Sequence, residues 1–220
     1  MRILLLTDSL GCPRREINVD NTWTDRIIKK WSSHDMYFYT HCKHGLSLGD
    51  IDITYINEIE PDVIIMQVGV VDASRRALSR KEVKIISKLP LIRTIVKKIC
   101  NKFHYRITKV RNINYCSLND FKCIIKKIIN ETGACVVFLK IAPPGKTLKR
   151  KVYNIQNDID KYNNAIKENC MLRFLDPYVG NVDDYILESD GHHLNLRGEE
   201  MVFCAVDRFI SEIMEENINV

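Results

Sequence analysis

The 220-residue sequence is poor in residues that interrupt regular structure and contains no long apolar run. Nine glycines and six prolines, together with 45% hydrophobic residues, exclude collagen-like, low-complexity and disordered chains. No apolar run approaches the roughly 18 residues that a transmembrane helix needs. The apolar stretch Ile3–Leu6 is shorter than the ~7–15-residue core of a signal peptide. We therefore expect a cytoplasmic protein without a leader.

Cys-x-x-Cys motifs are also absent, although the sequence has eight cysteines. They are scattered along the chain: Cys12, Cys42, Cys100, Cys116, Cys123, Cys135, Cys170 and Cys204. A structural zinc site needs two clusters of soft ligands, and the nearest candidate, His41-Cys42-Lys43-His44, lacks a second half. We expect no metal site and no cofactor. We expect the thiols to be reduced and mostly buried, as is usual outside oxidising compartments.

Short apolar runs bounded by turn residues alternate along the chain with helical patterns. The predicted strands are Ile3–Leu6, Met36–Thr40, Val63–Val68, Cys135–Ile141 and Met171–Leu175. The predicted helices outside the basic segment described next are Thr22–Trp31, Asn119–Asn130, Asn154–Asn169 and Leu196–Met214. Nearly all-apolar strands that alternate with helices predict a parallel sheet covered on both faces. We predict one α/β domain over residues 1–220, a three-layer α/β/α sandwich with a central parallel sheet.

A strongly basic segment interrupts this alternation. From Arg75 to Arg111, thirteen residues are basic and only Glu82 is acidic, so the net charge of this segment is +12. Because the net charge of the whole chain is +5, the residues outside the segment have a net charge of −7. Its apolar residues recur every three or four positions, as on a helix face: Ile85, Leu89, Ile92, Val96, Ile99 and Phe103. Pro90 favours two helices, the second beginning near that proline. We predict a basic helical insertion over residues 75–118 that serves as a lid or a docking surface.

Two interpretations of this insertion stay open. In the first, its apolar face packs on the core and its lysines lie in water. In the second, it is a surface for an anionic lipid, an anionic glycan or a nucleic acid, and the lipid case predicts a peripheral membrane contact. Few aromatic residues are available there for base stacking, namely Phe103 and Tyr105, so nucleic acid is the least favoured partner.

Residues with catalytic chemistry follow the predicted strands, where parallel sheets place their binding sites. The segments after the first three strands are Thr7-Asp8-Ser9-Leu10-Gly11, His44-Gly45 and Gln67-Val68-Gly69-Val70-Val71-Asp72. Asp190-Gly191-His192-His193 precedes the last helix, and an Asp three residues before a His can fix the tautomer of its ring. Each segment alone also fits an ordinary turn or helix cap, so their order carries the argument.

In that order the segments resemble the SGNH/GDSL hydrolase family over nearly the whole chain. Thr7-Asp8-Ser9-Leu10 is similar to the family's first block, Gly-Asp-Ser-Leu, with Thr7 in place of glycine. Gly45 lies where the second-block glycine belongs, and Gly69-Val70-Val71-Asp72 resembles the third block, Gly-x-Asn-Asp. Asp190 and His193 match the Asp-x-x-His block, and the following Asn195 and Gly198 favour His193 over His192. The resemblance implies a flavodoxin-like sandwich.

The resemblance also implies a site for acyl transfer. Ser9 would be the nucleophile, His193 the general base and acid, and Asp190 the residue that orients His193. The backbone N–H groups of Ser9 and Gly45 would form the oxyanion hole. The family's third-block Asn supplies a further donor, but this sequence has Val71, which cannot donate. Loss of one such donor typically lowers turnover by about 10²–10³.

Polar residues near the strand ends are candidates to replace that donor and to bind substrate. We predict substrate contacts for Arg14, Gln67, Asp72, Arg75 and Arg76. The arginines would bring full positive charge toward an anionic substrate. The alternative is that they are surface residues that contribute only to solubility.

The predicted function is therefore removal of a small acyl group, such as acetyl, from an ester on a carbohydrate or another small molecule. The first alternative is an O-acetyltransferase of surface-polysaccharide assembly, which would use the same triad with a sugar hydroxyl in place of water. The second alternative is a non-catalytic module that binds a glycan or a protein partner on the same fold. Val71 favours this last alternative, whereas the complete set of Ser9, His193 and Asp190 opposes it.

Overall fold

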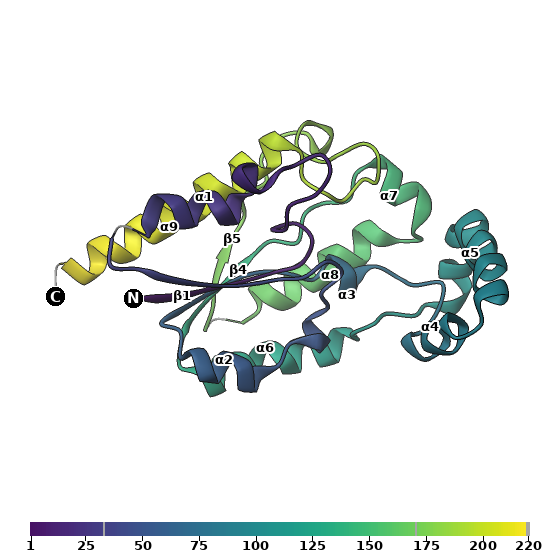
Figure 1. Cartoon of the computed structure of the whole chain (residues 1–220), viewed down its shortest axis with the longest axis horizontal. Helices are drawn as coiled ribbons and strands as arrows, with labels where there is room; N and C mark the ends of the chain where they lie inside the picture. Colours follow the sequence, from purple (N-terminus) through teal and green to yellow (C-terminus); the bar gives the residue numbers. More distant parts are fainter. Residues whose placement is uncertain (33, 170, 219–220) are drawn as a thin grey trace.

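The computed structural model describes residues 1–32, 34–169 and 171–218, and in this part of the chain a sheet lies between two layers of helices (Figure 1). The described residues form a five-stranded parallel sheet of order β2-β1-β3-β4-β5. Its strands are β1 (Arg2–Thr7), β2 (Tyr37–Cys42), β3 (Val63–Gln67), β4 (Cys135–Leu139) and β5 (Arg173–Leu175). The predicted α/β/α sandwich is confirmed. The strand order reverses between β1 and β3, and such a switch point opens a crevice at the carboxyl ends of the strands.

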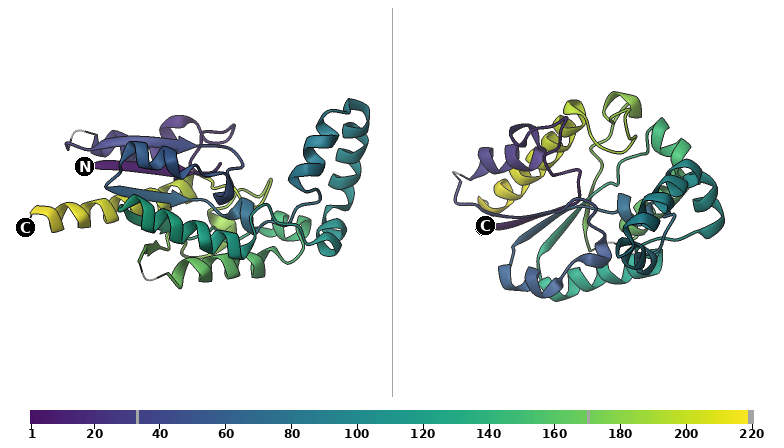
Figure 2. Two further views of the ribbon diagram at one scale, coloured as in Figure 1. Left: turned by 90° about the horizontal axis from the view of Figure 1, so that it is seen from below. Right: turned by 45° about the vertical axis from the view of Figure 1, so that its right-hand side comes forward.

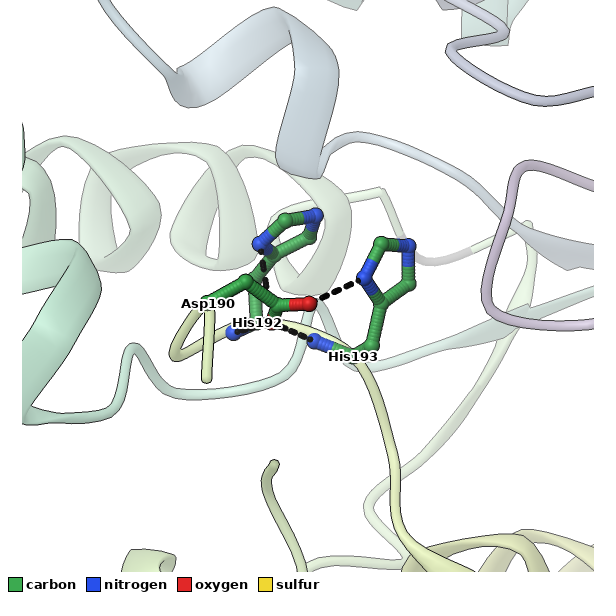
Figure 3. A group of neighbouring side chains, drawn as sticks. All are labelled: Asp190, His192 and His193. Atoms are coloured by element: carbon green, nitrogen blue, oxygen red, sulfur yellow. Dashed lines mark hydrogen bonds and ion pairs between the residues drawn. The ribbon is translucent and has the colours of Figure 1, made fainter. Parts of the chain in front are cut away.

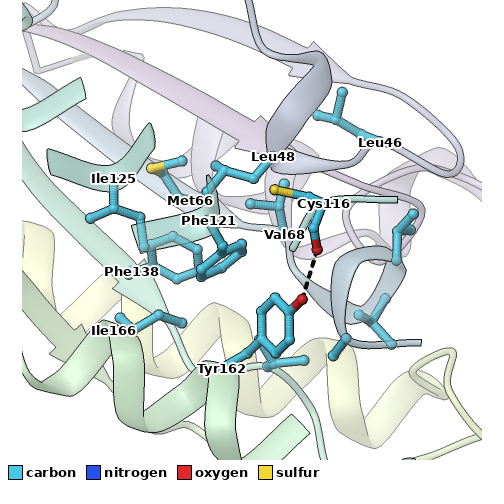
Figure 4. Close-up of a cluster of buried hydrophobic side chains, with 14 of the residues drawn as sticks. Leu46, Leu48, Met66, Val68, Cys116, Phe121, Ile125, Phe138, Tyr162 and Ile166 are labelled. Carbon is cyan, nitrogen blue, oxygen red and sulfur yellow. Dashed lines mark hydrogen bonds between the residues drawn. The ribbon is translucent and has the colours of Figure 1, made fainter. Parts of the chain in front are cut away.

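The strand β1 supplies side chains to both hydrophobic layers, because successive residues of a strand point to opposite faces. Ile3 and Leu5 lie in the cluster covered by α1 (Trp23–Trp31) and α9 (Leu196–Ile218). Leu4 and Leu6 lie in the cluster covered by α2 (Ile53–Ile59), α6 (Leu118–Thr132) and α8 (Ile155–Lys167). Figure 4 shows the second cluster, where the Phe121 and Tyr162 rings meet edge to face at 4.9 Å. Burial on both faces explains the apolar run Ile3–Leu6 within β1.

Short helices are the elements that the sequence does not predict. They are α2, α3 (Val70–Ala73), α7 (Lys146–Lys151) and the 3₁₀ helices Val19–Asn21, Leu48–Asp50 and Val182–Asp184. None is longer than seven residues, so an apolar pattern has too little length to repeat. The last strand begins at Arg173 rather than at the predicted Met171.

Two helices of the basic segment form a hairpin that projects from the sandwich, at the end where the strands terminate (Figure 2). We call α4 (Arg80–Ser87) and α5 (Pro90–Arg111) the basic hairpin. As predicted, the second helix begins at Pro90, a residue that is favoured in a first turn. The apolar face does not pack on the core: Ile85, Leu89, Ile92, Ile99 and Phe103 are between 39% and 62% exposed. The first interpretation of this segment is therefore wrong.

All seven cysteines in the described part of the chain are free thiols, and Cys170 lies outside it. Cys12 and Cys116 are buried and Cys100 is half-buried, whereas the other four are exposed: Cys42, Cys123, Cys135 and Cys204. The expectation of mostly buried thiols is wrong. Cys123 lies on α6 and Cys204 on α9, whereas Cys42 ends β2 and Cys135 begins β4.

Candidate active site

Ser9 lies in a tight turn directly after β1, at the carboxyl edge of the sheet. The Asp8 N–H extends the ladder to β3 by donating to the Gln67 carbonyl (3.0 Å). The Asp8 carboxyl oxygen Oδ1 then accepts the Leu10 N–H (2.9 Å), which turns the chain away from the sheet. Gly11 is required in this turn, because a Cβ would lie 2.5 Å from Thr7 Oγ1. The turn therefore holds the Ser9 side chain at the switch point of the fold.

Asp190 organises the loop that carries His193 (Figure 3). Its oxygen Oδ1 accepts the backbone N–H groups of His192 and His193, at 2.9 and 3.0 Å. Gly191, between Asp190 and His192, has a φ of +74°, and a Cβ there would clash with the backbone nitrogen of Leu148 in α7. Glycine is therefore needed both for the backbone conformation and for the close approach to α7.

The His193 ring bridges Asp190 and Ser9. Its Nδ1 lies 2.7 Å from Asp190 Oδ2, and its Nε2 lies 2.9 Å from Ser9 Oγ. These are hydrogen-bond distances at which Nδ1–H donates to the carboxylate and Nε2 accepts the serine hydroxyl. The His192 ring lies against the His193 ring, with centroids 4.0 Å apart, and does not take this bridging place. The structure brings together the three residues that the sequence predicts as catalytic.

The surroundings favour an ionised Asp190 and a neutral His192. Burial alone would raise the pKa of the Asp190 carboxyl, but hydrogen bonds from the His193 ring and from two backbone N–H groups outweigh it, and the pKa lies well below its ordinary value. Burial, assisted by the neighbouring His193, lowers the pKa of His192 to about 4. An ionised Asp190 can stabilise the positive charge that develops on His193 when it accepts a proton.

Ser9 and Gly45 line the same cavity, as an oxyanion hole requires. Among the described residues, no hydrogen-bond acceptor is found for the backbone N–H of either one. Gly45 has a φ of +72°, which favours glycine, and no atom lies within 4 Å of the point where a Cβ would be. Two free N–H groups beside a serine hydroxyl can stabilise a developing oxyanion.

The cavity beside Ser9 has a volume of about 350 Å³. Val71 lines it with an apolar side chain, at the position where the family pattern has a donor. Among the described residues, Asp190 is the one carboxylate of the lining. Apart from Ser9, Asp190 and His193, the polar side chains of the lining are His44, Ser74, Arg75, Arg76, His104, Lys151 and His192. The lining is therefore predominantly basic.

The three cations of this lining differ in their partners. Arg75 forms a bidentate ion pair with Asp158, at 2.6 and 3.2 Å, so its charge is compensated. Arg76 donates from Nη2 to the Val71 carbonyl (3.0 Å), and its buried Nε has no acceptor in the described residues. Lys151 forms no ion pair within the part of the chain that the structure describes. Arg76 and Lys151 therefore bring to the cavity positive charge that no ion pair of the described residues compensates.

Arg14, a predicted substrate-binding residue, does not line the cavity. It forms an ion pair with Glu199 at 2.7 Å, and both side chains are almost completely buried. A second donor nitrogen of Arg14 lies 3.1 Å from the Ser9 carbonyl. Arg14 therefore joins the turn that contains Ser9 to α9. Because Glu199 compensates its charge and Arg14 does not line the cavity, the predicted contact of Arg14 with substrate is not supported.

Gln67 and Asp72 are likewise directed into the protein rather than into the cavity. The Gln67 side chain accepts the Trp23 indole N–H (2.7 Å) and donates to the Tyr178 hydroxyl (3.3 Å). Asp72 is fully buried and accepts a hydrogen bond from the Ser47 hydroxyl. Both side chains are hydrogen-bonded to other protein groups. The predicted contacts of Gln67 and Asp72 with substrate are therefore not supported by the structure.

The sequence does not predict His104 and Lys151, which also line the cavity. The His104 ring donates from Nδ1 to the Lys151 carbonyl (3.0 Å), which joins α5 of the basic hairpin to α7. Burial lowers the pKa of His104. Neither residue belongs to a motif, and the sequence offered one indication only, that the basic insertion directly follows the third block.

Asp190, His192 and His193 also bring ligand atoms within 4.8 Å of one another, a spacing that a metal ion could use. However, His193 already has one ring nitrogen at Asp190 and the other at Ser9. Both ring nitrogens of His193 are thus engaged, and the arrangement fits proton transfer between Ser9 and His193 with Asp190 as the orienting carboxylate.

Known structures share this fold, although no protein-family model matches the sequence and no curated protein matches it significantly. A lipase/acylhydrolase from Enterococcus faecalis has a TM-score of 0.64 and 17% identity, with 95% of this chain and 94% of that chain covered. An acetylxylan esterase from Geobacillus stearothermophilus has a TM-score of 0.62 and 10% identity, with 94% of this chain and 92% of that chain covered. A psychrotrophic esterase from Pseudoalteromonas sp. has a TM-score of 0.55 and 12% identity, with 96% of this chain and 98% of that chain covered.

These similarities extend over nearly the full length of both chains, so they concern the whole α/β/α sandwich and not one motif of it. The fold that the resemblance implied is thereby confirmed. A fold can host several activities, and the function of this chain has to be argued from its own site.

Proposed function

We propose that this protein is a serine carboxylic ester hydrolase that removes a small acyl group, such as acetyl. The observation that carries this proposal is the pair of hydrogen bonds from Ser9 through His193 to Asp190, at 2.9 and 2.7 Å. A module that only binds a glycan needs no serine, histidine and carboxylate in this alignment. The relay therefore favours an enzyme over the binding module.

The geometry supports a two-step reaction. Ser9 Oγ attacks the ester carbonyl carbon while His193 Nε2 accepts the hydroxyl proton, and the backbone N–H groups of Ser9 and Gly45 donate to the resulting oxyanion. The tetrahedral intermediate collapses, the C–O bond to the alcohol breaks, and the alcohol takes the proton from Nε2. Water then attacks the acyl-enzyme by the same proton transfers, releasing the acid and free Ser9. Asp190 stabilises the protonated His193 in both steps.

The cavity favours a small, negatively charged substrate. Its volume of about 350 Å³ lies at the lower end of the range for small-molecule sites, which suits a short acyl group on a compact alcohol. Arg76 and Lys151 would attract a carboxylate or phosphate on that alcohol. One structural neighbour is described as an acetylxylan esterase. We therefore propose an acetyl ester of an acidic carbohydrate as the substrate class.

Labelling with a fluorophosphonate tests this function directly. We expect covalent labelling of the wild type and hydrolysis of p-nitrophenyl acetate, both lost in Ser9→Ala. Ser74→Ala is the matched control, because Ser74 lines the same cavity and is also buried. Absence of labelling that depends on Ser9 would contradict the proposed enzyme. Labelling with slow release of p-nitrophenol that accelerates when a sugar acceptor is added, with the acetyl group recovered on the sugar, would instead identify an O-acetyltransferase.

A further inference from the structure

The basic hairpin has an apolar helix face that the described residues leave exposed. Leu91 is 83% exposed, Ile95 59% and Ile99 49%. Ile92 is exposed as well, and these positions follow the three- and four-residue spacing of one helix face. Isolated exposed apolar residues are normal in folded proteins, but a continuous apolar helix face indicates a surface that is covered in use.

The charge of the basic hairpin identifies the kind of surface that could cover this face. From Arg80 to Arg111 it contains eleven basic residues and one acid, a net charge of +10. Arg80 pairs with Asp50, and Arg111 pairs with Glu82. The other nine basic residues form no ion pair in the part of the chain that the structure describes: Lys81, Lys84, Lys88, Arg93, Lys97, Lys98, Lys102, Arg106 and Lys109. A second copy of the hairpin would bring the same charge and would be repelled.

We propose that the basic hairpin docks on the surface of an anionic lipid bilayer, with the apolar face of α5 among the acyl chains. Lysines that flank the apolar face keep their ammonium groups at the headgroups while their carbon chains lie along the apolar region. No helix of the described residues is long and apolar enough to cross a membrane, so α5 would lie along the interface. The hairpin projects from the sandwich (Figure 2), and Leu91 and Ile95 of its apolar face are exposed.

Docking would also bring the candidate active site close to the bilayer. His104 of α5 lines the cavity and donates to the Lys151 carbonyl at 3.0 Å. The hairpin lies at the end of the molecule where the strands terminate (Figure 1), and the cavity lining includes both His104 of the hairpin and Ser9, which follows β1. Membrane docking itself does not depend on the proposed hydrolysis, and binding can be measured apart from activity.

Co-sedimentation with vesicles tests the proposal. We expect the wild type to bind vesicles of phosphatidylcholine with phosphatidylserine, to bind phosphatidylcholine alone weakly, and to dissociate as the salt concentration rises. The double variant Lys97→Gln/Lys98→Gln should weaken binding by about five-fold per lysine removed. The matched control is Lys126→Gln/Lys127→Gln, an exposed pair on α6 that should bind like the wild type.

A second variant tests the apolar contribution. Leu91→Ser/Ile95→Ser should lose most of the binding, while its thermal unfolding and its hydrolysis of p-nitrophenyl acetate stay at wild-type levels, because both side chains are exposed. The proposal fails if the wild type does not bind anionic vesicles at low salt, or if binding ignores lipid charge. It also fails if sedimentation velocity without lipid shows a dimer that Leu91→Ser/Ile95→Ser dissociates, since the apolar face would then cover a second copy.

Discussion

Ser9 and His193 are separated by 184 positions in the sequence, and their side chains lie 2.9 Å apart. Ser9 belongs to the turn after the first strand, and His193 to the loop before the last helix. Two independent turns hold them, one closed by Asp8 and the other by Asp190. The pair is thus positioned by local structure on each side and by the packing of α9 against the sheet between them.

Two adjacent histidines provide a direct test of the relay. His193→Gln should lower kcat/KM for a small acetyl ester by about 10⁴ or more, because the general base is lost. His192→Gln should lower it by much less, because His192 does not contact Ser9 in the relay. Steady-state kinetics of the two variants make the comparison, with thermal unfolding to show that both are folded. Equal losses in the two variants would contradict the assignment of the base.

The uncompensated cations predict a preference for anionic esters. The wild type should hydrolyse 3-acetoxybenzoate with a kcat/KM about ten-fold or more above that of the neutral 3-acetoxybenzamide. Arg76→Gln/Lys151→Gln should remove most of this preference and leave the neutral ester nearly unaffected. Lys149→Gln is the control, since Lys149 belongs to the same helix and does not line the cavity. A wild type that hydrolyses the two esters equally would exclude charge recognition in this cavity.

Because Val71 cannot donate a hydrogen bond, we expect that a donor introduced at this position raises kcat. Val71→Asn would add a side-chain donor where Val71 lines the cavity, and we expect kcat to rise by about 10–10². Val71→Thr is the control, because its hydroxyl is shorter than the Asn amide. The measurement is kcat for p-nitrophenyl acetate at saturation. A folded Val71→Asn variant with unchanged kcat would show that an existing group already fills the place of the missing donor.

The buried Asp8 predicts a pH-dependent stability. Burial raises the pKa of the Asp8 carboxyl to about 7, so between about pH 4 and pH 7 the folded state holds a proton that the unfolded state releases. Asp8 therefore makes the free energy of unfolding fall as pH rises, by up to about 4 kcal/mol over this range. Asp8→Asn should remove this contribution and gain stability relative to the wild type as pH rises.

Urea denaturation at several pH values measures the effect of Asp8. The exposed Asp160→Asn should follow the wild type at each pH. A constant difference in unfolding free energy between Asp8→Asn and the wild type from pH 4 to pH 8 would contradict the assigned protonation of Asp8.

The juxtaposition of Ser9, Asp190 and His193 was predictable because each lies in a short motif whose local geometry is strict. Gly11 and Gly191 leave no room for a Cβ, and Asn195 accepts the Gly198 N–H (3.1 Å) at the start of α9. Such turns require particular residues at fixed spacings, so the sequence alone shows them. The substrate-binding predictions were poorer, because proximity to a motif does not decide which way a long side chain points. Arg14 pairs with buried Glu199, 185 positions away, and no local pattern announces that partner.

The sequence by itself determined the alternation of strands and helices, the motifs around Ser9 and His193, and the separation of charge into a −7 body and a +12 segment. These follow from local periodicity, turn chemistry and composition. Only the tertiary structure decided that Asp158 compensates Arg75, while Arg76 and Lys151, which line the cavity with Ser9, have no ion pair among the described residues. It also decided that the apolar face of the basic hairpin is exposed and not packed on the core. Burial and ion pairing depend on contacts between distant segments, which residue spacing along the chain does not encode.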